Sequence, residues 1–181
     1  MHILDTIKTR RTHFKFLDQE IPREVLERAL EAAIWAPNHK LTEPWYFYVL
    51  AGDSKKHLAE LRYEVVLSVF ENEARAQKAR QEMQEAPVII VVTQTQSEDV
   101  ELQLENTLSV GAAVQNFLLA LWHEGVGSYW GTGPLTKSDK VYKYLDIPDT
   151  SKVVGILFLG YPARQGHGRR TPWQDKTTFL T

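Results

Sequence analysis

The chain has 181 residues, which is enough for one compact domain with a hydrophobic core and too few for two ordinary domains. Hydrophobic residues make up 43% and charged residues 24%, as in soluble globular proteins. The formal net charge of −2 gives no overall basic excess for nucleic acid, and the absence of cysteine excludes disulfides, thiolate nucleophiles and cysteine-based metal sites. We expect one domain over residues 1–181.

The sequence also bears on the compartment. The N-terminus lacks the continuous apolar segment of a secretory signal. No uncharged apolar run approaches the roughly 18–20 residues that a membrane span requires. We therefore expect a cytoplasmic protein that has neither a membrane nor a nucleic acid as its partner.

The first half of the sequence predicts helices before and after a single strand. Hydrophobic residues at helical spacing indicate a short helix before Arg10, and Pro22 opens a second helix that Pro37 ends. The run Trp45–Leu50 predicts a strand. The charged region from about Ser54 to Glu85 predicts one or two helices that are mostly exposed.

The second half predicts a buried strand and a long central helix. The β-branched run Pro87–Thr93 is typical of a strand buried on both faces, and Glu101–Glu124 forms a helix that is apolar nearly all round. Small residues at 111–113 would let another backbone approach that helix. The remaining predictions are a brief strand at 128–130, a helix near 137–145, a core strand at 153–162 and a polar tail at 163–181. The alternation of helices and strands favours three α/β layers.

Two arginine pairs are candidate anion ligands. Arg10, Arg11 and Thr12 follow the first helix, and Arg169 and Arg170 lie near the other end of the chain. A guanidinium presents a rigid fork of donors that matches phosphate oxygens, and a threonine hydroxyl adds another donor. The alternative is that both pairs are solvated surface charges.

Two loops are candidate sites for a planar ligand. Trp35 and His39 lie in a segment where a helix stops and a loop rich in hydrogen-bonding groups begins, and an ordinary capped turn is the alternative. Gly131, Thr132 and Gly133 form a turn after a short strand. Glycines let backbone N–H groups approach a ligand closely, although a tight strand-to-helix turn would use the same residues.

The sequence gives little support for a metal site, a serine hydrolase site or a dinucleotide-binding turn. No H-x-x-x-H motif and no triplet of histidine, aspartate and glutamate stands at metal-ligand spacing, so we expect no metal site. No serine lies in a G-x-S-x-G elbow, and no strand-to-helix turn carries G-x-G-x-x-G.

Taken together, these segments resemble the nitroreductase family of FMN flavoproteins, and most closely its short bacterial NAD(P)H nitroreductases. The resemblance runs over nearly the whole chain. It rests on the order and spacing of Arg10–Phe14, Ala36–Lys40 with Pro44-Trp45, the Gly-Thr-Gly turn and Leu159–Pro162.

The resemblance implies an α+β fold, a three-layer α/β/α sandwich with a central mixed sheet. It also implies a homodimer whose protomers exchange terminal segments and form FMN sites at their interface. By position, Arg10, Arg11 and Thr12 would bind the FMN phosphate and ribityl chain, with Arg169 and Arg170 as further phosphate ligands. Trp35 and His39 would approach the flavin, from the partner subunit, and Gly131, Thr132 and Gly133 would line the ring. The stretch Leu121, Trp122, His123, Glu124, Gly125 and Val126 matches one assigned to NAD(P)H in similar proteins.

The implied activity is hydride transfer from NADH or NADPH through flavin N5 to electron-poor acceptors such as nitroaromatics or quinones, in a ping-pong scheme. Because the cofactor carries the chemistry, no catalytic side chain is expected. Two alternatives remain open: a non-catalytic flavin-binding or flavin-storage protein of the same fold, and a regulatory module that binds another phosphorylated ligand.

Overall fold

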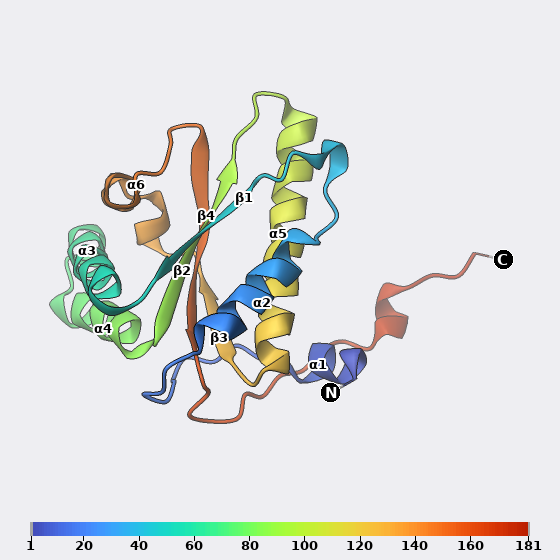
Figure 1. Cartoon of the computed structure of the whole chain (residues 1–181), viewed down its shortest axis with the longest axis horizontal. Coiled ribbons are helices and arrows are strands. Elements are labelled where there is room, and N and C mark those ends of the chain that lie inside the picture. Colours follow the sequence, from blue (N-terminus) through green and yellow to red (C-terminus); the bar gives the residue numbers. More distant parts are fainter. Residues whose placement is uncertain (1, 181) are drawn as a thin grey trace.

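A four-stranded sheet forms the middle of the molecule. The computed structural model describes residues 2–180, so Met1 and Thr181, which the expected domain and tail include, lie outside the described residues. The strands are β1 (Trp45–Leu50), β2 (Val88–Thr95), β3 (Gly127–Gly131) and β4 (Ser151–Gly160), in the spatial order β1-β2-β4-β3. Helices cover both faces of this sheet, as Figure 1 shows. The predicted α+β class with three layers is confirmed.

The expected mixed sheet is wrong for the described strands. All three neighbouring pairs, β1–β2, β2–β4 and β3–β4, are antiparallel. The parallel pairing that the structure shows is an isolated bridge between Thr12 and Ser128, outside the named strands. The two helices that connect β1 to β2 return the chain so that β2 runs antiparallel beside β1. The helical connection between β1 and β2 therefore does not imply that the two strands run parallel.

The central strand β2 supplies both cores. Its residues are buried from Val88 to Gln94, and alternate side chains point to opposite faces. Ile90 and Val92 pack in the cluster beneath α2 (Arg23–Ile34) and α5 (Val100–His123). Ile89 and Val91 pack in the cluster beneath α3 (Gly52–Phe70), α4 (Glu73–Glu85) and α6 (Asp139–Leu145). The continuous apolar run in this strand follows from its burial on both sides.

The predicted charged region forms two helices, α3 and α4, which a left-handed residue, Glu71, separates. The expected exposure holds for their outer faces. Their inner faces are buried, with Leu58, Ala59 and Met83 fully inaccessible to solvent. The buried inner face of α4 could not be predicted from its low apolar content, because alanines supply much of its contact surface.

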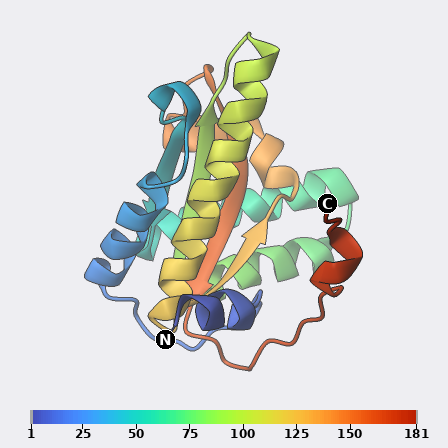
Figure 2. The same ribbon diagram turned by 90° about the vertical axis from the view of Figure 1, so that its right-hand side faces the viewer.

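The terminal segments lie at one end of α5. Helix α1 (Ile3–Thr9) is held there by Trp122 of α5, whose Nε1 donates to Thr9 Oγ1 at 2.9 Å. After β4 the chain runs past α1 and then projects away from the body, carrying the short 3-10 helix η3 (Trp173–Lys176) (Figures 1 and 2). The tail from 163 to 180 contains no fully buried residue, which confirms that it is not core. Among residues 2–180, no helix combines the length and apolar composition that a bilayer crossing needs.

Candidate functional site

Three guanidinium groups form a positive cluster where α1 ends. Arg10 is half-buried, and its pKa is lowered first by burial and then by the positive charges of Arg170 and Arg11. Within residues 2–180, none of these three arginines forms an ion pair with a carboxylate. We call Arg10, Arg11 and Arg170 the arginine cluster. Its positive charge is not offset by a carboxylate, an arrangement that favours a nearby anion.

Arg11 is fixed in this cluster by the backbone around it. Its Nη1 donates to the carbonyls of Lys8 (2.6 Å) and Arg10 (2.7 Å). The tail crosses its side chain closely: a Cβ added at Gly166 would lie 2.4 Å from Arg11 Cβ, and one at Gly168 would lie 2.8 Å from Nε. Only residues without a side chain allow this approach. Arg11 Nε is left buried without a hydrogen-bond partner, a donor that still requires an acceptor.

Thr12 connects the arginine cluster to strand β3. Thr12 forms a bridge with Ser128, and the backbone N–H of His13 donates to the Ser128 carbonyl at 2.9 Å. Gly131 lies three residues further along β3, about 10 Å away at the usual strand rise. The predicted phosphate ligands and the predicted glycine turn are therefore neighbours within one chain.

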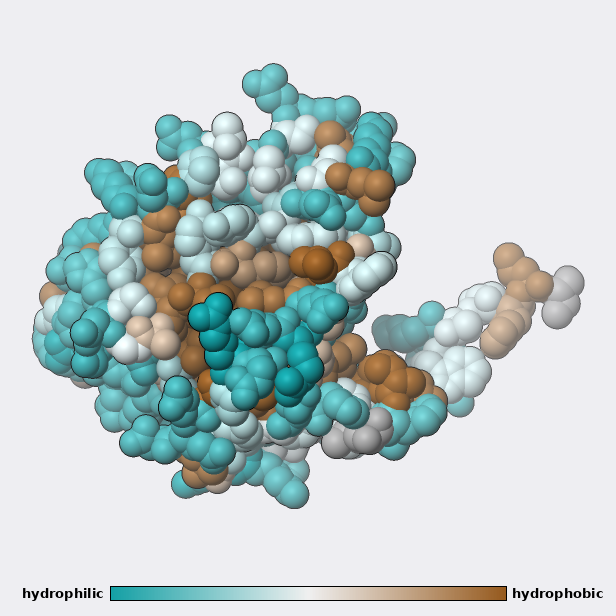
Figure 3. Space-filling view, in the orientation of Figure 1, coloured by the Kyte–Doolittle hydropathy of each residue, from teal (hydrophilic) through white to brown (hydrophobic). Residues whose placement is uncertain are grey.

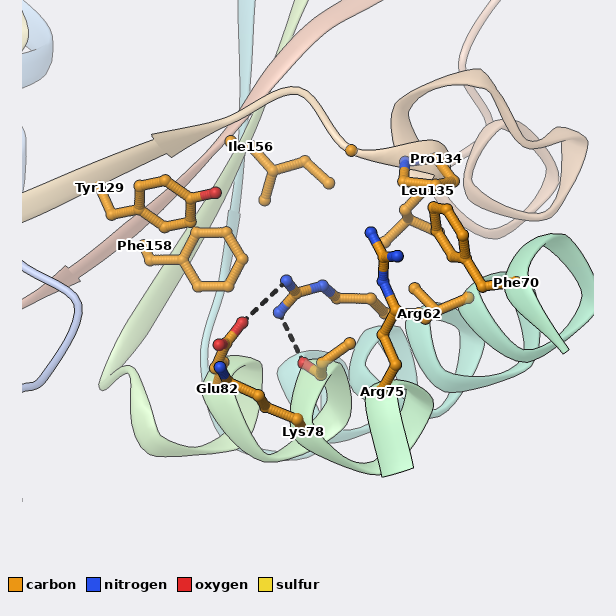
Figure 4. A pocket seen from close by; sticks show the side chains of 14 residues that line it. Arg62, Phe70, Arg75, Lys78, Glu82, Tyr129, Pro134, Leu135, Ile156 and Phe158 are labelled. Carbon is orange, nitrogen blue, oxygen red and sulfur yellow. Dashed lines mark hydrogen bonds and ion pairs between the residues drawn. The ribbon is translucent and has the colours of Figure 1, made fainter. Parts of the chain in front are cut away.

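The Gly131–Gly133 turn lies between two cavities. Gly131 and Gly133 line a cavity between α3, α4 and the strands β3 and β4, which we call the α3/α4 pocket (Figure 4). Thr132 lines a groove on the α5 face of the sheet. This α5 groove has a volume of about 470 Å³ and lies between α5 at Gly111 and the edge of β3 and β4. Trp130 and Thr132 line it, together with Lys137 and Lys152. Trp130 rests on β4 at Gly155, where an added Cβ would lie 1.9 Å from the indole nitrogen. The groove thus offers an aromatic side chain, a glycine turn and two cations.

Trp35 and His39 lie elsewhere in the chain. Trp35 caps the end of α2, is 79% exposed, and lines an apolar groove between α1, α2 and α5. His39, in the 3-10 helix η1 (His39–Leu41), has its Nδ1 2.8 Å from Glu105 of α5. Glu105 and Trp122 are 17 residues apart on α5, about 25 Å along the helix. His39 and the arginine cluster therefore lie at opposite ends of α5.

The loop that carries His39 is held by polar contacts that the sequence did not predict. Asn38 donates to Ser109 Oγ at 3.2 Å, and Thr42 donates to Asn106 Oδ1 at 2.7 Å. Asn106 and Ser109 are both buried on α5. Asn106 and Ser109 are polar residues in a helix that is otherwise largely apolar, and this pattern was the sequence signal from which a polar contact could have been predicted.

The stretch expected to contact a nicotinamide nucleotide is the end of α5. Leu121 and Val126 are fully buried, so a nucleotide could meet these two residues only through their backbone. Gly125 takes a left-handed conformation (φ 82°) that closes the helix, and Val126 N–H donates to the Leu121 carbonyl. Glu124 pairs with Arg28 at 3.0 Å. His123 and Glu124 line the same apolar groove as Trp35, and Trp122 stacks on His13.

Lys137 and Lys152 are groove residues that the sequence analysis missed. They come from the 3-10 helix η2 (Pro134–Lys137) and from the start of β4, and no motif relates them. Across residues 2–180, no three histidines or carboxylates gather in a way that could hold a metal ion.

Comparison with known proteins gives one consistent family. The family model described as "Nitroreductase family" matches residues 7–161. The Escherichia coli (strain K12) protein named "Putative NAD(P)H nitroreductase YdjA" is 29% identical over 183 residues, which cover 100% of this chain and 99% of that protein.

Solved structures agree with this result. A nitroreductase-like family protein from Bacillus cereus is 30% identical, with a TM-score of 0.86 over 99% of this chain and 96% of that one. A Desulfovibrio desulfuricans protein, described as a "putative nitroreductase in complex with fmn", has the same fold at 24% identity. Its TM-score is 0.77 over 100% of this chain and 98% of that one.

Proposed function

Because the chain belongs to the nitroreductase family, we propose that it is an FMN-dependent oxidoreductase that uses NADH or NADPH as its reductant. The observation that carries this proposal is the arginine cluster. Three guanidinium groups gather without a carboxylate partner in residues 2–180, and the adjoining Thr12 pairs with Ser128 on the strand that leads to the glycine turn.

The arginine cluster fits the phosphate end of FMN. A phosphate would offset the positive charges of Arg170 and Arg11, which add to the effect of burial in lowering the pKa of Arg10. Thr12 is exposed beside the cluster and can donate its hydroxyl. Arg169 is exposed next to Arg170, whose Nη1 donates to the Arg169 carbonyl. We assign Arg10, Arg11 and Arg170 as the main phosphate ligands, with Thr12 and Arg169 at the edge.

The Gly131–Gly133 turn fits the ring end of the same cofactor. Gly131 and Gly133 line the α3/α4 pocket and Thr132 lines the α5 groove, so a ring edge can approach the backbone of this turn. Lys137 and Lys152 favour negative charge in the groove. Bound FMN would accept hydride from NAD(P)H at N5 and pass it to an electron-poor acceptor, such as a nitroaromatic or a quinone, in a second half-reaction. The chain's own residues bind and orient the cofactor and give the groove its charge.

We further propose that two copies of the chain complete each site. His39 lies about 25 Å along α5 from the arginine cluster, so His39 would reach the flavin from the partner subunit. We assign Trp35, which ends the helix before His39 and is 79% exposed, to the same partner-derived surface. Apolar residues stand exposed on α5 at Leu104 and Leu108, four residues apart on one face. Figure 3 shows further hydrophobic surface on α1 and at the end of the tail, where Phe179 and Leu180 are exposed. A second copy would cover these surfaces, with the projecting tail exchanged between protomers.

Mixed dimers test the shared site. One chain carries Arg10→Ala and Arg11→Ala, and the other carries Trp35→Ala and His39→Ala. Each double variant alone should bind FMN poorly. Mixing them by co-expression should restore one site per dimer, because one of the two sites then combines intact arginines from one chain with intact Trp35 and His39 from the other. FMN is counted by its absorption near ~450 nm. No recovery in mixed dimers that do form would refute the shared site.

Catalysis is tested on the FMN-loaded protein. Anaerobic rapid mixing with NADH and with NADPH should bleach the flavin band, and adding a quinone or a nitroarene should restore it. A ping-pong scheme predicts parallel lines in double-reciprocal plots of initial rates. Flavin binding without bleaching by either nucleotide would make the chain a flavin carrier and refute the proposed activity.

A further inference from the structure

The loop that carries His39 has an unusual backbone. Three of its residues, Lys40 (φ 62°), Leu41 (φ 51°) and Glu43 (φ 43°), adopt left-handed conformations although none of them is glycine. A Cβ atom disfavours this region, so such residues persist only where surrounding contacts hold them. We call residues 38–43 the 38–43 loop. Its shape must come from contacts with the rest of the chain, and Figure 1 shows it beside the N-terminal half of α5.

Polar contacts with α5 fix both ends of the 38–43 loop. The Asn38 side chain donates to Ser109 Oγ at 3.2 Å, and Thr42 donates to Asn106 Oδ1 at 2.7 Å. Within the loop, Asn38 Oδ1 accepts from the Glu43 backbone N–H at 2.6 Å. Asn106 and Ser109 are buried, so water competes little for these bonds. The loop is therefore anchored to a rigid part of the helix.

Glu105 holds the His39 side chain from the same part of α5. Its Oε2 lies 2.8 Å from His39 Nδ1. An isolated pair with these exposures, 62% for His39 and 38% for Glu105, would gain little, because water competes and two side chains lose freedom. Here both backbones are already fixed, one by the 38–43 loop and the other by the helix. The carboxylate therefore selects one orientation of the imidazole at a small entropic cost.

The partner of Nδ1 also decides what the other ring nitrogen can do. A carboxylate only accepts hydrogen bonds, so Nδ1 must carry the hydrogen, and Nε2 of a neutral imidazole is then an acceptor. Among residues 2–180, no hydrogen bond of the protein uses His39 Nε2. This nitrogen is therefore left to a ligand that offers an N–H or O–H group.

We propose that Glu105 is a positioning residue, which keeps His39 in the Nδ1–H tautomer so that Nε2 accepts a hydrogen bond from the bound cofactor. This role rests on the proposed function, in which His39 of one chain reaches the flavin of its partner. FMN carries suitable donors at ring N3 and on the ribityl chain. Glu105 itself acts only through the imidazole.

The tautomer is measured on the FMN-free protein by nitrogen-15 NMR at about pH 8, where an imidazole is ordinarily neutral. In the parent, His39 should carry its hydrogen on Nδ1. Glu105→Ala removes the acceptor and should shift the ring toward the Nε2–H tautomer. Glu105→Gln keeps an acceptor oxygen and should retain most of the Nδ1–H form. An Nε2–H ring in the parent, or equal behaviour of the Ala and Gln variants, would overturn the proposal.

FMN affinity then links the tautomer to the cofactor. His39→Ala should raise the Kd for FMN by about tenfold, as expected for one lost hydrogen bond, and Glu105→Ala by about fivefold. In a His39→Ala background, Glu105→Ala should change the Kd by less than about twofold, because its effect passes through the imidazole. Glu101→Ala is the matched control. Glu101 lies one turn earlier on α5, is exposed and forms no ion pair within residues 2–180, so its Kd should equal that of the parent.

The outcomes separate this role from the proposed function. Additive effects of Glu105→Ala and His39→Ala on the Kd would overturn the positioning role, while the contact between His39 and the flavin would stand. An unchanged Kd in His39→Ala would refute that contact and, with it, the role of Glu105. The tautomer measured without FMN would not be affected by that second result.

Discussion

Replacing Gly155 with alanine should force the Trp130 indole off its seat on β4. An added Cβ would lie 1.9 Å from Trp130 Nε1 and 2.6 Å from Cδ1. Ordinary contacts between heavy atoms need about 3.5 Å, so the indole must retreat by roughly 1.6 Å. Trp130 is 39% exposed and has room to move toward the α5 groove that it lines. The Trp130 indole can therefore relieve the clash by moving, and this movement takes it into the α5 groove beside the proposed flavin site.

The expected loss of unfolding free energy follows from the room that the Trp130 indole has to move. Overpacking a core costs about 1–3 kcal/mol, and a half-exposed side chain that can swing aside should cost about 1–2 kcal/mol. The same substitution without the indole should be neutral or slightly stabilising, because glycine inside a strand is worse than alanine by roughly 0.5–1 kcal/mol. The loss of stability caused by Gly155→Ala should therefore disappear or reverse in a Trp130→Ala background.

The assay is a double-mutant cycle on the flavin-free protein. Urea unfolding gives the unfolding free energies of the parent, Gly155→Ala, Trp130→Ala and the double variant. The coupling energy, the difference between these two effects, should be about 1–3 kcal/mol. FMN affinity should fall in Gly155→Ala, since the displaced indole occupies groove volume. An additive cycle, within about 0.5 kcal/mol, would show that Trp130 does not rest on Gly155 and would refute the reasoning.

Three further substitutions test the site and the core. Arg10→Ala should raise the Kd for FMN by about 10- to 150-fold, the equivalent of about 1.5–3 kcal/mol for a hydrogen bond to a charged group, without lowering the melting temperature. Arg23→Ala, at an exposed i,i+4 pair with Glu27, is its control and should leave the Kd unchanged. His13 is buried, and burial lowers its pKa below 6.5, so the unfolded chain takes up the proton first as the pH falls. The unfolding free energy should therefore drop below about pH 6.5, and equal slopes for the parent and His13→Gln in urea unfolding between pH 7.5 and 5.5 would contradict this. Phe117→Ala removes a fully buried ring that stacks on Phe47 and should cost about 3–5 kcal/mol in denaturant unfolding; a loss below about 1 kcal/mol would contradict its central position.

The sequence predicted elements better than it predicted their directions. Trp45–Leu50 is a strand with the predicted bounds, because its aromatic and β-branched residues favour strand conformation. Strand direction is different, since it depends on how a connection crosses the sheet, and local periodicity carries no information on that path. The expected mixed sheet came from the resemblance and is antiparallel in the described strands.

The arginine cluster shows what the sequence could suggest and what it could not. Arg10 and Arg11 are adjacent, so their repulsion is readable from the sequence alone. Arg170 joins them only because the tail returns past α1 and packs Gly166 and Gly168 against Arg11. Two glycines in a polar tail are weak signals by themselves. Their meaning depends on a side chain more than 150 residues away, which only the fold brings into contact.

The α3/α4 pocket could not be predicted for a related reason. Its aromatic wall comes from β3 and β4, whose residues alternate between the two faces of the sheet, so Tyr129 faces this pocket while Trp130 faces the α5 groove. A shift of one residue in β3 would exchange the two rings between the two cavities. The register Tyr129–Phe158 and Trp130–Leu157 therefore decides which cavity receives which aromatic side chain. Since Gly131 and Gly133 follow on the same strand and turn, one backbone segment bounds both cavities, and any change in register would alter both.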